Sequence, residues 1–285
     1  MYRHFILTRF NLRLWTKDKH GQQTRTAEWL EKRFNLFETY CLPSIQNQSV
    51  LNFKWIVLFD AETPEPYRTR VYAYEKQCDA FAPYFIAPKE GRYFTRTFQK
   101  IVAEQIQPND IVITTYLDND DALRYDYIEK VQELAAHVED KTFISFKYGL
   151  QYFTQLNIAT LVPFLNNHFI SLVERNAPLS SIRTVFGYGS HIAIHSYPGT
   201  HTLYINQPSQ AEWIEVVHET NMDNDIRMTF DTHLITDQHK MQREYGLPIQ
   251  LSPHSRCIFY TRFLPRAFKE ILRHIRYRIV GRKWE

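Results

Sequence analysis

Glycine is scarce in this chain, with eight residues among 285, whereas globular proteins average about 7% glycine. This scarcity excludes sites that are built on glycine-rich loops. There is no G-x-x-x-x-G-K-[ST] phosphate loop, and the close pair Gly187 and Gly189 lacks the third glycine of a dinucleotide-binding fingerprint. The G-x-S-x-G and H-E-x-x-H motifs are also missing. P-loop nucleotide binding and these two hydrolase classes are therefore excluded.

Cysteines and long apolar runs are also few. Cys41, Cys78 and Cys257 form no C-x-x-C pair, so we expect neither a disulfide framework nor a zinc knuckle, and we expect a reducing compartment. The first residues show no signal-peptide pattern, and no apolar stretch approaches the roughly 18 residues that span a bilayer. The formal net charge is only +3. These features predict a cytoplasmic protein, and a chain of this length can bury a full core.

The first 140 residues alternate short apolar runs with helical patterns. The predicted strands cover residues 4–8, 54–59, 81–87 and 110–117. The predicted helices cover residues 30–41 (ending at Pro43), about 67–77, and 94–101, and a further helix follows Asp126 and Glu129, which have capping-box spacing. Strands that alternate with helices predict an α/β fold with a mostly parallel central sheet and helices on both faces.

The second half is rich in β patterns. These runs lie at residues 142–147, 168–173, 191–194 and 202–205. They predict mixed strands added around the first sheet. Because no linker or repeat divides the chain, we expect one domain over residues 1–261, followed by a tail over residues 262–285.

An acidic run, Asp118-Asn119-Asp120-Asp121, follows the clearest predicted strand. Ligands of parallel sheets bind at the carboxyl ends of the strands. In extended backbone Asp118 and Asp120 would point the same way, and their carboxylates would repel unless a cation lay between them. Mg²⁺ or Mn²⁺ suits such oxygen ligands. The alternative is an acidic turn that caps the next helix, but the position after a buried strand favours metal binding.

Several metal-dependent chemistries do not fit this run. A D-x-D-x-[TV] phosphatase would need Thr or Val where Ala122 stands, and an EF-hand would need Gly where Leu123 stands. A sugar nucleotidyltransferase would need a glycine-rich loop after the first strand, where residues 8–13 contain no glycine. The remaining possibility is the Asp-x-Asp site of nucleotide-sugar glycosyltransferases, in which a cation bridges the carboxylates and the donor diphosphate.

Three sequence blocks resemble those of bacterial putative rhamnosyltransferases: Thr8-Arg9-Phe10-Asn11, residues 114–123 (TTYLDNDDAL) and residues 213–221 (WIEVVHETN). The similarity spans roughly residues 1–235, with Glu219 standing where the family tends to have glycine. It implies a GT-A-like (Rossmann-like) glycosyltransferase of polysaccharide biosynthesis. Such an enzyme would use Mn²⁺ or Mg²⁺ and a nucleoside-diphosphate sugar as donor, with rhamnose as one candidate for the transferred sugar. Its acceptor would be a glycan or a lipid-linked glycan.

The resemblance also implies roles for individual residues. Asp118 and Asp120 would hold the cation, and a late histidine, His218, would complete the metal or diphosphate site. The alternative for His218 is a packed or surface histidine. Asn221 would hold a phosphate or orient His218. Asp60, at the end of the second predicted strand, would contact the base or ribose of the donor, unless it caps a turn.

Further donor contacts are expected at the same sheet edge. Arg9 and Asn11 follow the first predicted strand, and Arg9 offers a planar fork to phosphate or base carbonyls. Arg96 begins a helix that faces this edge. Solvated arginines or salt bridges are the alternatives for both.

A general base is needed if the reaction inverts the anomeric centre. The candidates are His191, Glu212, Glu215 and Glu219. We select His191, beside Tyr188-Gly189-Ser190, and Glu215, although no motif singles out either residue.

The tail contains eight Lys and Arg against one acid between residues 262 and 283. Apolar residues from Leu264 to Ile279 recur at helical spacing, which predicts a basic amphipathic helix. Such a helix can lie on an anionic membrane, here the inner face of the cytoplasmic membrane; packing on the domain or a dimer contact are the alternatives. Nucleic acid is not expected, since the remaining chain is nearly charge-balanced. The alternative to an enzyme is a non-catalytic nucleotide- or glycan-binding module with a membrane-surface helix.

Overall fold

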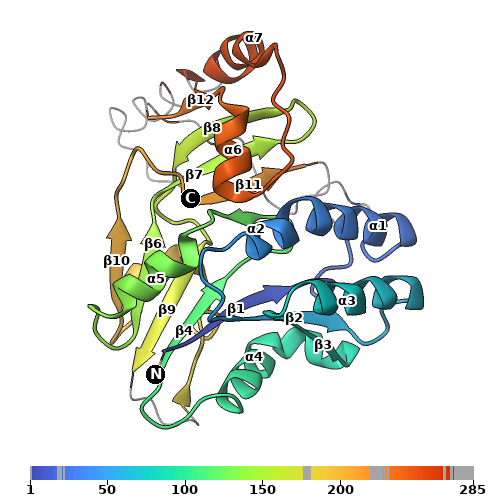
Figure 1. The fold of residues 1–285 in the computed structure, drawn as a ribbon, viewed down its shortest axis with the longest axis vertical. Helices are drawn as coiled ribbons and strands as arrows, with labels where there is room; N and C mark the ends of the chain where they lie inside the picture. The colour runs from blue at the N-terminus through green and yellow to red at the C-terminus, as the bar shows by residue number, and fades with distance from the viewer. Residues whose placement is uncertain are drawn as a thin grey trace.

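The computed structural model describes residues 2–17, 21, 23–175, 181–218, 227, 229, 231–265, 268, 269 and 272. Its centre is a seven-stranded sheet (Figure 1). The strands lie in the order β10 (His201–Ile205), β6 (Thr142–Phe146), β9 (Ile170–Arg175), β4 (Ile111–Tyr116), β1 (Tyr2–Arg9), β2 (Lys54–Asp60) and β3 (Phe81–Ile86). Only β9 runs antiparallel to its neighbours, β4 and β6. The predicted α/β fold with a mostly parallel central sheet is confirmed.

Helices cover both faces of this sheet. One face of the sheet is covered by three helices, which share a core cluster with the strand residues that point to that face: α1 (Ala27–Leu36), α3 (Glu65–Gln77) and α5 (Tyr127–Ala135). The other face is covered by α4 (Phe94–Ala103), which packs with the strand residues that point the opposite way. On β2, for example, Val57 belongs to the first cluster and Ile56 to the second. Successive strand residues face opposite sides, so strands covered on both sides have near-continuous apolar sequences. This is why the sequence predicted β1, β2 and β4 correctly.

A second sheet of five strands lies beside the first (Figure 1). Its order is β12 (His233–Ile235), β8 (Ile158–Pro163), β7 (Tyr148–Phe153), β11 (Trp213–Val217) and β5 (Ala122–Leu123). Its core cluster includes Met241 and Tyr245 of α6 (Gln238–Tyr245). β5 directly follows the acidic run and pairs with β11, so the acidic run connects the two sheets.

Three local predictions were wrong. The first helix does not end at Pro43, because a π-helical segment (Phe37–Cys41) leads into α2 (Leu42–Gln46), whose first turn accommodates the proline. Residues 191–194 are not a strand: they lie in a 3-10 helix, η4 (His191–Ser196), whose N-terminus Ser190 caps. Asp126 makes no capping bond to α5 and instead pairs with Arg124.

Two further helical segments complete the described elements. Residues 88–93 form a 3-10 helix, η2 (Pro88–Tyr93), before α4. α7 (Ser255–Ile258) continues into a π-helical segment (Phe259–Phe263), and the fully buried ring of Phe263 lies 4.8 Å from that of Phe153. Most of the predicted tail helix lies outside the described residues. Within the described part of the chain, no helix has the length and apolar character needed to cross a membrane.

Candidate active site

A cavity of about 550 Å³ lies where β1 and β4 end. Its walls come from the loop after β1, from α1, from the acidic run, from the β8–β9 connection, from η4 and from Arg227. The carboxyl ends of parallel strands form the edge where such folds bind ligands, and a volume of this size accommodates a small-molecule substrate. The cavity is therefore the candidate active site.

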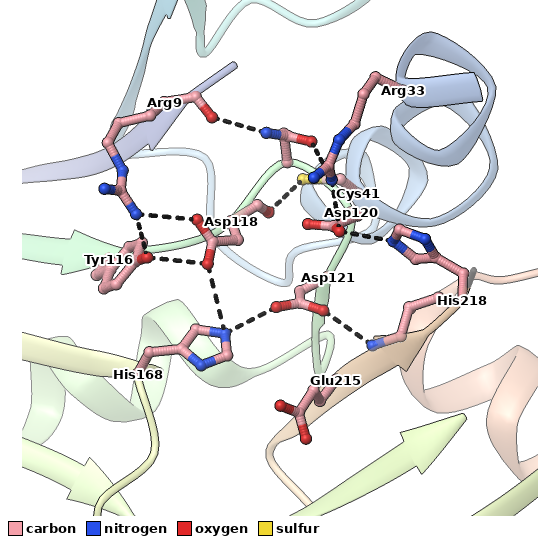
Figure 2. Close-up of polar contacts among 12 residues, drawn as sticks. Arg9, Arg33, Cys41, Tyr116, Asp118, Asp120, Asp121, His168, Glu215 and His218 are labelled. Carbon is pink, nitrogen blue, oxygen red and sulfur yellow. Dashed lines mark hydrogen bonds and ion pairs between the residues drawn. The ribbon is translucent and has the colours of Figure 1, made fainter. Parts of the chain in front are cut away.

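The acidic run forms a turn, not an extended segment. The backbone N–H of Asp121 donates to the carbonyl of Asp118 over 3.4 Å. Asp118 and Asp120 consequently have different partners, Arg9 and Arg33 respectively, as Figure 2 shows. The expectation that the two carboxylates point the same way from extended backbone was wrong.

Asp118 is the acid most open to the cavity, with 31% of its side chain exposed. Its Oδ2 accepts a hydrogen bond of 2.9 Å from the Tyr116 hydroxyl and lies 3.9 Å from Nε2 of His168. Its Oδ1 lies 3.5 Å from Nη2 of Arg9. Asp118 therefore retains accessible oxygen surface for a ligand.

Arg9 is held in an aromatic cage beside this acid. Its Cζ lies 5.0 Å from the ring centre of Phe94, 5.3 Å from that of Tyr116 and 5.2 Å from that of Phe186. Such contacts fix a guanidinium without removing its charge. The end of β1 thus presents an oriented guanidinium to the cavity.

Asp120 is enclosed by cationic partners. Its Oδ2 accepts from Nη1 of Arg33 over 2.7 Å and lies 2.8 Å from Nε2 of His218. Burial disfavours the carboxylate, but the charge of Arg33 and the hydrogen bond with His218 outweigh it and lower the pKa of Asp120 well below its usual range. The structure thus brings the predicted residues Asp120 and His218 together, while Asp118 faces a different group.

A second set of residues has the spacing of metal ligands. One ligand atom from each of Asp118, Asp121 and His168 lies within 4.8 Å of the others. Asp121 Oδ2 is 2.7 Å from Nε2 of His168, and its Oδ1 accepts from the backbone N–H of Val216 over 2.8 Å. Carboxylate oxygens and imidazole nitrogen suit Mn²⁺. These residues therefore fit a divalent cation.

The neighbouring acids favour the protonated form of His168. Burial disfavours the imidazolium, but the hydrogen bond to Asp121 and the charges of Asp121 and Asp118 raise the pKa of His168 to about 9. A cation at this site would displace that proton. The sequence analysis named Asp121 only as part of the acidic run, and no motif marks His168.

The comparisons with known proteins identify the family. A family model described as "Putative rhamnosyl transferase" matches residues 6–229. The chain belongs to this family. The resemblance inferred from the three sequence blocks is thereby confirmed.

Other comparisons add little to the family match. No curated protein matches the chain. Two solved structures of S. aureus TarS, one described as TarS 1-349, are similar to 76% of it at 10% identity with a TM-score of 0.40. This family member spans 37% and 60% of those two chains.

Three other residues predicted to contact the donor, Asp60, Asn11 and Arg96, are not among the residues that line the cavity. Asp60 is buried, and its Oδ2 accepts from Nε of Arg13 over 2.6 Å. Asn11 accepts from the backbone N–H of Asp60 and donates to Thr63, so it braces the loops after β1 and β2. The guanidinium carbon of Arg96 lies 5.7 Å from the ring centre of Tyr93. Asn221 lies outside the described residues.

The candidate bases differ in position. His191 lines the cavity, 5.9 Å from the ring of His168, and burial together with the charge of His168 lowers its pKa to about 4. Glu215, on β11, is 1% exposed and pairs with Arg227, and Figure 2 shows its carboxylate turned away from the acidic run. Glu212 is buried against Lys130. Glu219 lies outside the described residues.

Proposed function

We propose that this family member transfers a sugar from a nucleoside diphosphate to a glycan or lipid-linked glycan in polysaccharide biosynthesis. The family description names rhamnosyl transfer, and rhamnose is the donor sugar that we propose. The observation that carries the proposal is the set Asp118, Asp121 and His168, which faces a substrate-sized cavity at the carboxyl end of β4.

In this proposal Asp118, Asp121 and His168 hold Mn²⁺ or Mg²⁺. The sequence analysis placed Asp120 and His218 in the metal site. In the structure these two side chains are hydrogen-bonded to each other, and Asp120 also forms an ion pair with Arg33. We assign these two residues to supporting the turn. A cation bound beside Asp118 would neutralise charge on the departing diphosphate. Arg9, fixed on the same wall, would contribute a permanent positive charge.

A transfer that inverts the anomeric centre requires a proton acceptor near the acceptor hydroxyl. The hydroxyl oxygen forms a bond to the anomeric carbon, the bond from that carbon to the diphosphate oxygen breaks, and its electron pair leaves with the nucleoside diphosphate. The hydroxyl proton passes to the base. We assign this role to His191, because its imidazole lines the cavity.

The described residues at the start of the tail and just before it support the tail proposal. Tyr260, Leu264, Phe268 and Leu272 recur every four residues and are between 48% and 62% exposed. Exposed apolar side chains among basic residues favour an anionic membrane surface. We therefore propose that residues 262–283 bring the enzyme to the inner face of the cytoplasmic membrane, where lipid-linked acceptors are accessible.

Hydrolysis of sugar donors tests the activity. We expect the protein with Mn²⁺ to release a nucleoside diphosphate from one donor of a panel that includes uridine, guanosine and thymidine diphosphate sugars. EDTA or Asp118→Asn should abolish the release. The control is Asp79→Asn, which removes an exposed acid just before β3, at the opposite edge of the sheet. Donor binding without any hydrolysis or transfer would instead support the non-catalytic module.

A further inference from the structure

We infer that Arg227, held in place by Glu215, forms a phosphate-binding subsite for the nucleoside diphosphate on the wall of the cavity. This inference rests on the proposed function and adds a residue to it. Arg227 belongs to none of the motifs in the sequence, and it gives Glu215 a positioning role in place of a base.

The subsite is built on two neighbouring strands. Gln151 of β7 and Glu215 of β11 lie side by side in the register of the second sheet. Nε2 of Gln151 donates to Oε2 of Glu215 over 2.7 Å, and the two residues are 0% and 1% exposed. A buried carboxylate fixed by a buried amide has a defined orientation. It is a rigid base for a third residue.

That third residue is Arg227, which is fixed at three points. Its backbone N–H donates to Oε1 of Gln151 over 2.8 Å, and its Nε and Nη2 donate to Glu215 over 3.3 and 3.2 Å. Its Cζ lies 3.6 Å from the ring centre of Phe164. The Arg227 side chain remains 29% exposed and lines the cavity. Nε and Nη2 of Arg227 thus orient the guanidinium against Glu215. The remaining N–H groups of this guanidinium are available for a ligand at the cavity wall.

Phosphate is the ligand that this arrangement fits. A guanidinium is planar and always charged, and it binds phosphate oxygens through paired N–H groups. Arg227 shares the cavity with Asp118 and His191, so a diphosphate beside the proposed cation lies within the same space. Stability alone does not explain the pair, because a buried ion pair is often no more stabilising than apolar residues of similar volume.

Binding of nucleoside diphosphates tests the inference. The dissociation constants of uridine, guanosine and thymidine diphosphates would be measured by calorimetry with Mn²⁺ on the full chain. For the one that binds best, Arg227→Gln should weaken binding about 10- to 100-fold, because a charge-assisted contact is lost. Arg227→Lys should fall in between, because it keeps the charge but loses the fork. Glu215→Gln should weaken binding less than Arg227→Gln.

Controls separate binding from folding. Arg243→Gln removes an exposed arginine of α6 and should leave the dissociation constant unchanged. Each variant is also melted without ligand. If Arg227→Gln lowers the melting temperature but its dissociation constant for the diphosphate stays within about twofold of that of the wild type, Arg227 has only a structural role and the inference is wrong. If the wild type binds none of the three diphosphates, the proposed function fails and the inference fails with it.

Discussion

Asp118 and Asp120, the two acids of the Asp-x-Asp sequence, should respond differently to substitution by asparagine. Asp120 has 10% of its side chain exposed and lies 2.7 Å from Arg33, whose side chain is 9% exposed. Asp118 is 31% exposed and lies 3.5 Å from Arg9. Asp120→Asn therefore leaves a buried arginine without its counter-charge, whereas Asp118→Asn removes a half-buried acid at a cavity. We expect the first change to affect stability and the second to affect cation binding.

The cost of Asp120→Asn follows from the burial of the pair. Removing one partner of a buried ion pair costs about 3–5 kcal/mol, and the lower end applies because the asparagine oxygen still accepts from Arg33. At roughly 2–4 °C per kcal/mol for a large domain, the melting temperature should fall by about 6–12 °C. Asp118→Asn should lose less than about 1 kcal/mol, the usual contribution of a partly solvated pair.

The assay is thermal unfolding at pH 7.5 in EDTA, followed by the same measurement in Mn²⁺. The lowered pKa of Asp120 means that its stabilisation is present above the unfolded pKa of about 3.9 and is lost only as the pH falls below it, so the full effect is measured at pH 7.5. Mn²⁺ should raise the melting temperature of the wild type but not that of Asp118→Asn. Equal melting of the two variants in EDTA would refute this division of roles.

Three other predictions concern the core, the pH dependence and the tail. Burial lowers the pKa of His4 to about 3, so the stability that its neutral form provides is present above the unfolded pKa of about 6.5 and is lost as the pH falls below it. Between pH 7 and 5, the free energy of unfolding of the wild type, measured in urea, should fall by about 2 kcal/mol relative to that of His4→Gln. Parallel pH profiles of the two unfolding free energies would contradict this. Gly149→Ala should cost about 1–3 kcal/mol or more in the same assay, because a Cβ would lie 2.0 Å from the Trp213 ring; an unchanged midpoint would contradict it. A chain truncated after Phe263 keeps that buried ring and should no longer sediment with anionic liposomes, whereas sedimentation like that of the full chain would refute the membrane role.

The central sheet was predictable because its strands are buried on both faces. Residues 54–59 and 110–117 are near-continuous apolar runs that no helical period explains, and β2 and β4 lie there. The order of elements then placed the acidic run at the edge where ligands bind. The topology thus predicted where the candidate site lies, without any information on which side chains meet there.

The contacts within the site could not be predicted, because they join residues far apart in the chain. Asn119 donates to the backbone carbonyls of Arg9 and Phe10 over 2.8 and 3.2 Å. These bonds tie the acidic run to the loop after β1, so it turns where an isolated strand end would continue extended. His168 reaches Asp121 across 47 residues, and only the folded sheet brings this pair together.

A cation between Asp118 and Asp120 was predicted because their carboxylates would otherwise repel each other. In the structure, side chains of the protein compensate this repulsion. Each of the three acids has a positive partner from a different element: Arg9 of β1 for Asp118, Arg33 of α1 for Asp120, and His168 for Asp121. The turn therefore does not need a metal ion to hold its carboxylates together. Of the three partners, only His168 can give up its charge by losing a proton. A divalent cation can therefore replace that charge beside Asp118 and Asp121, while Arg9 and Arg33 continue to hold the turn.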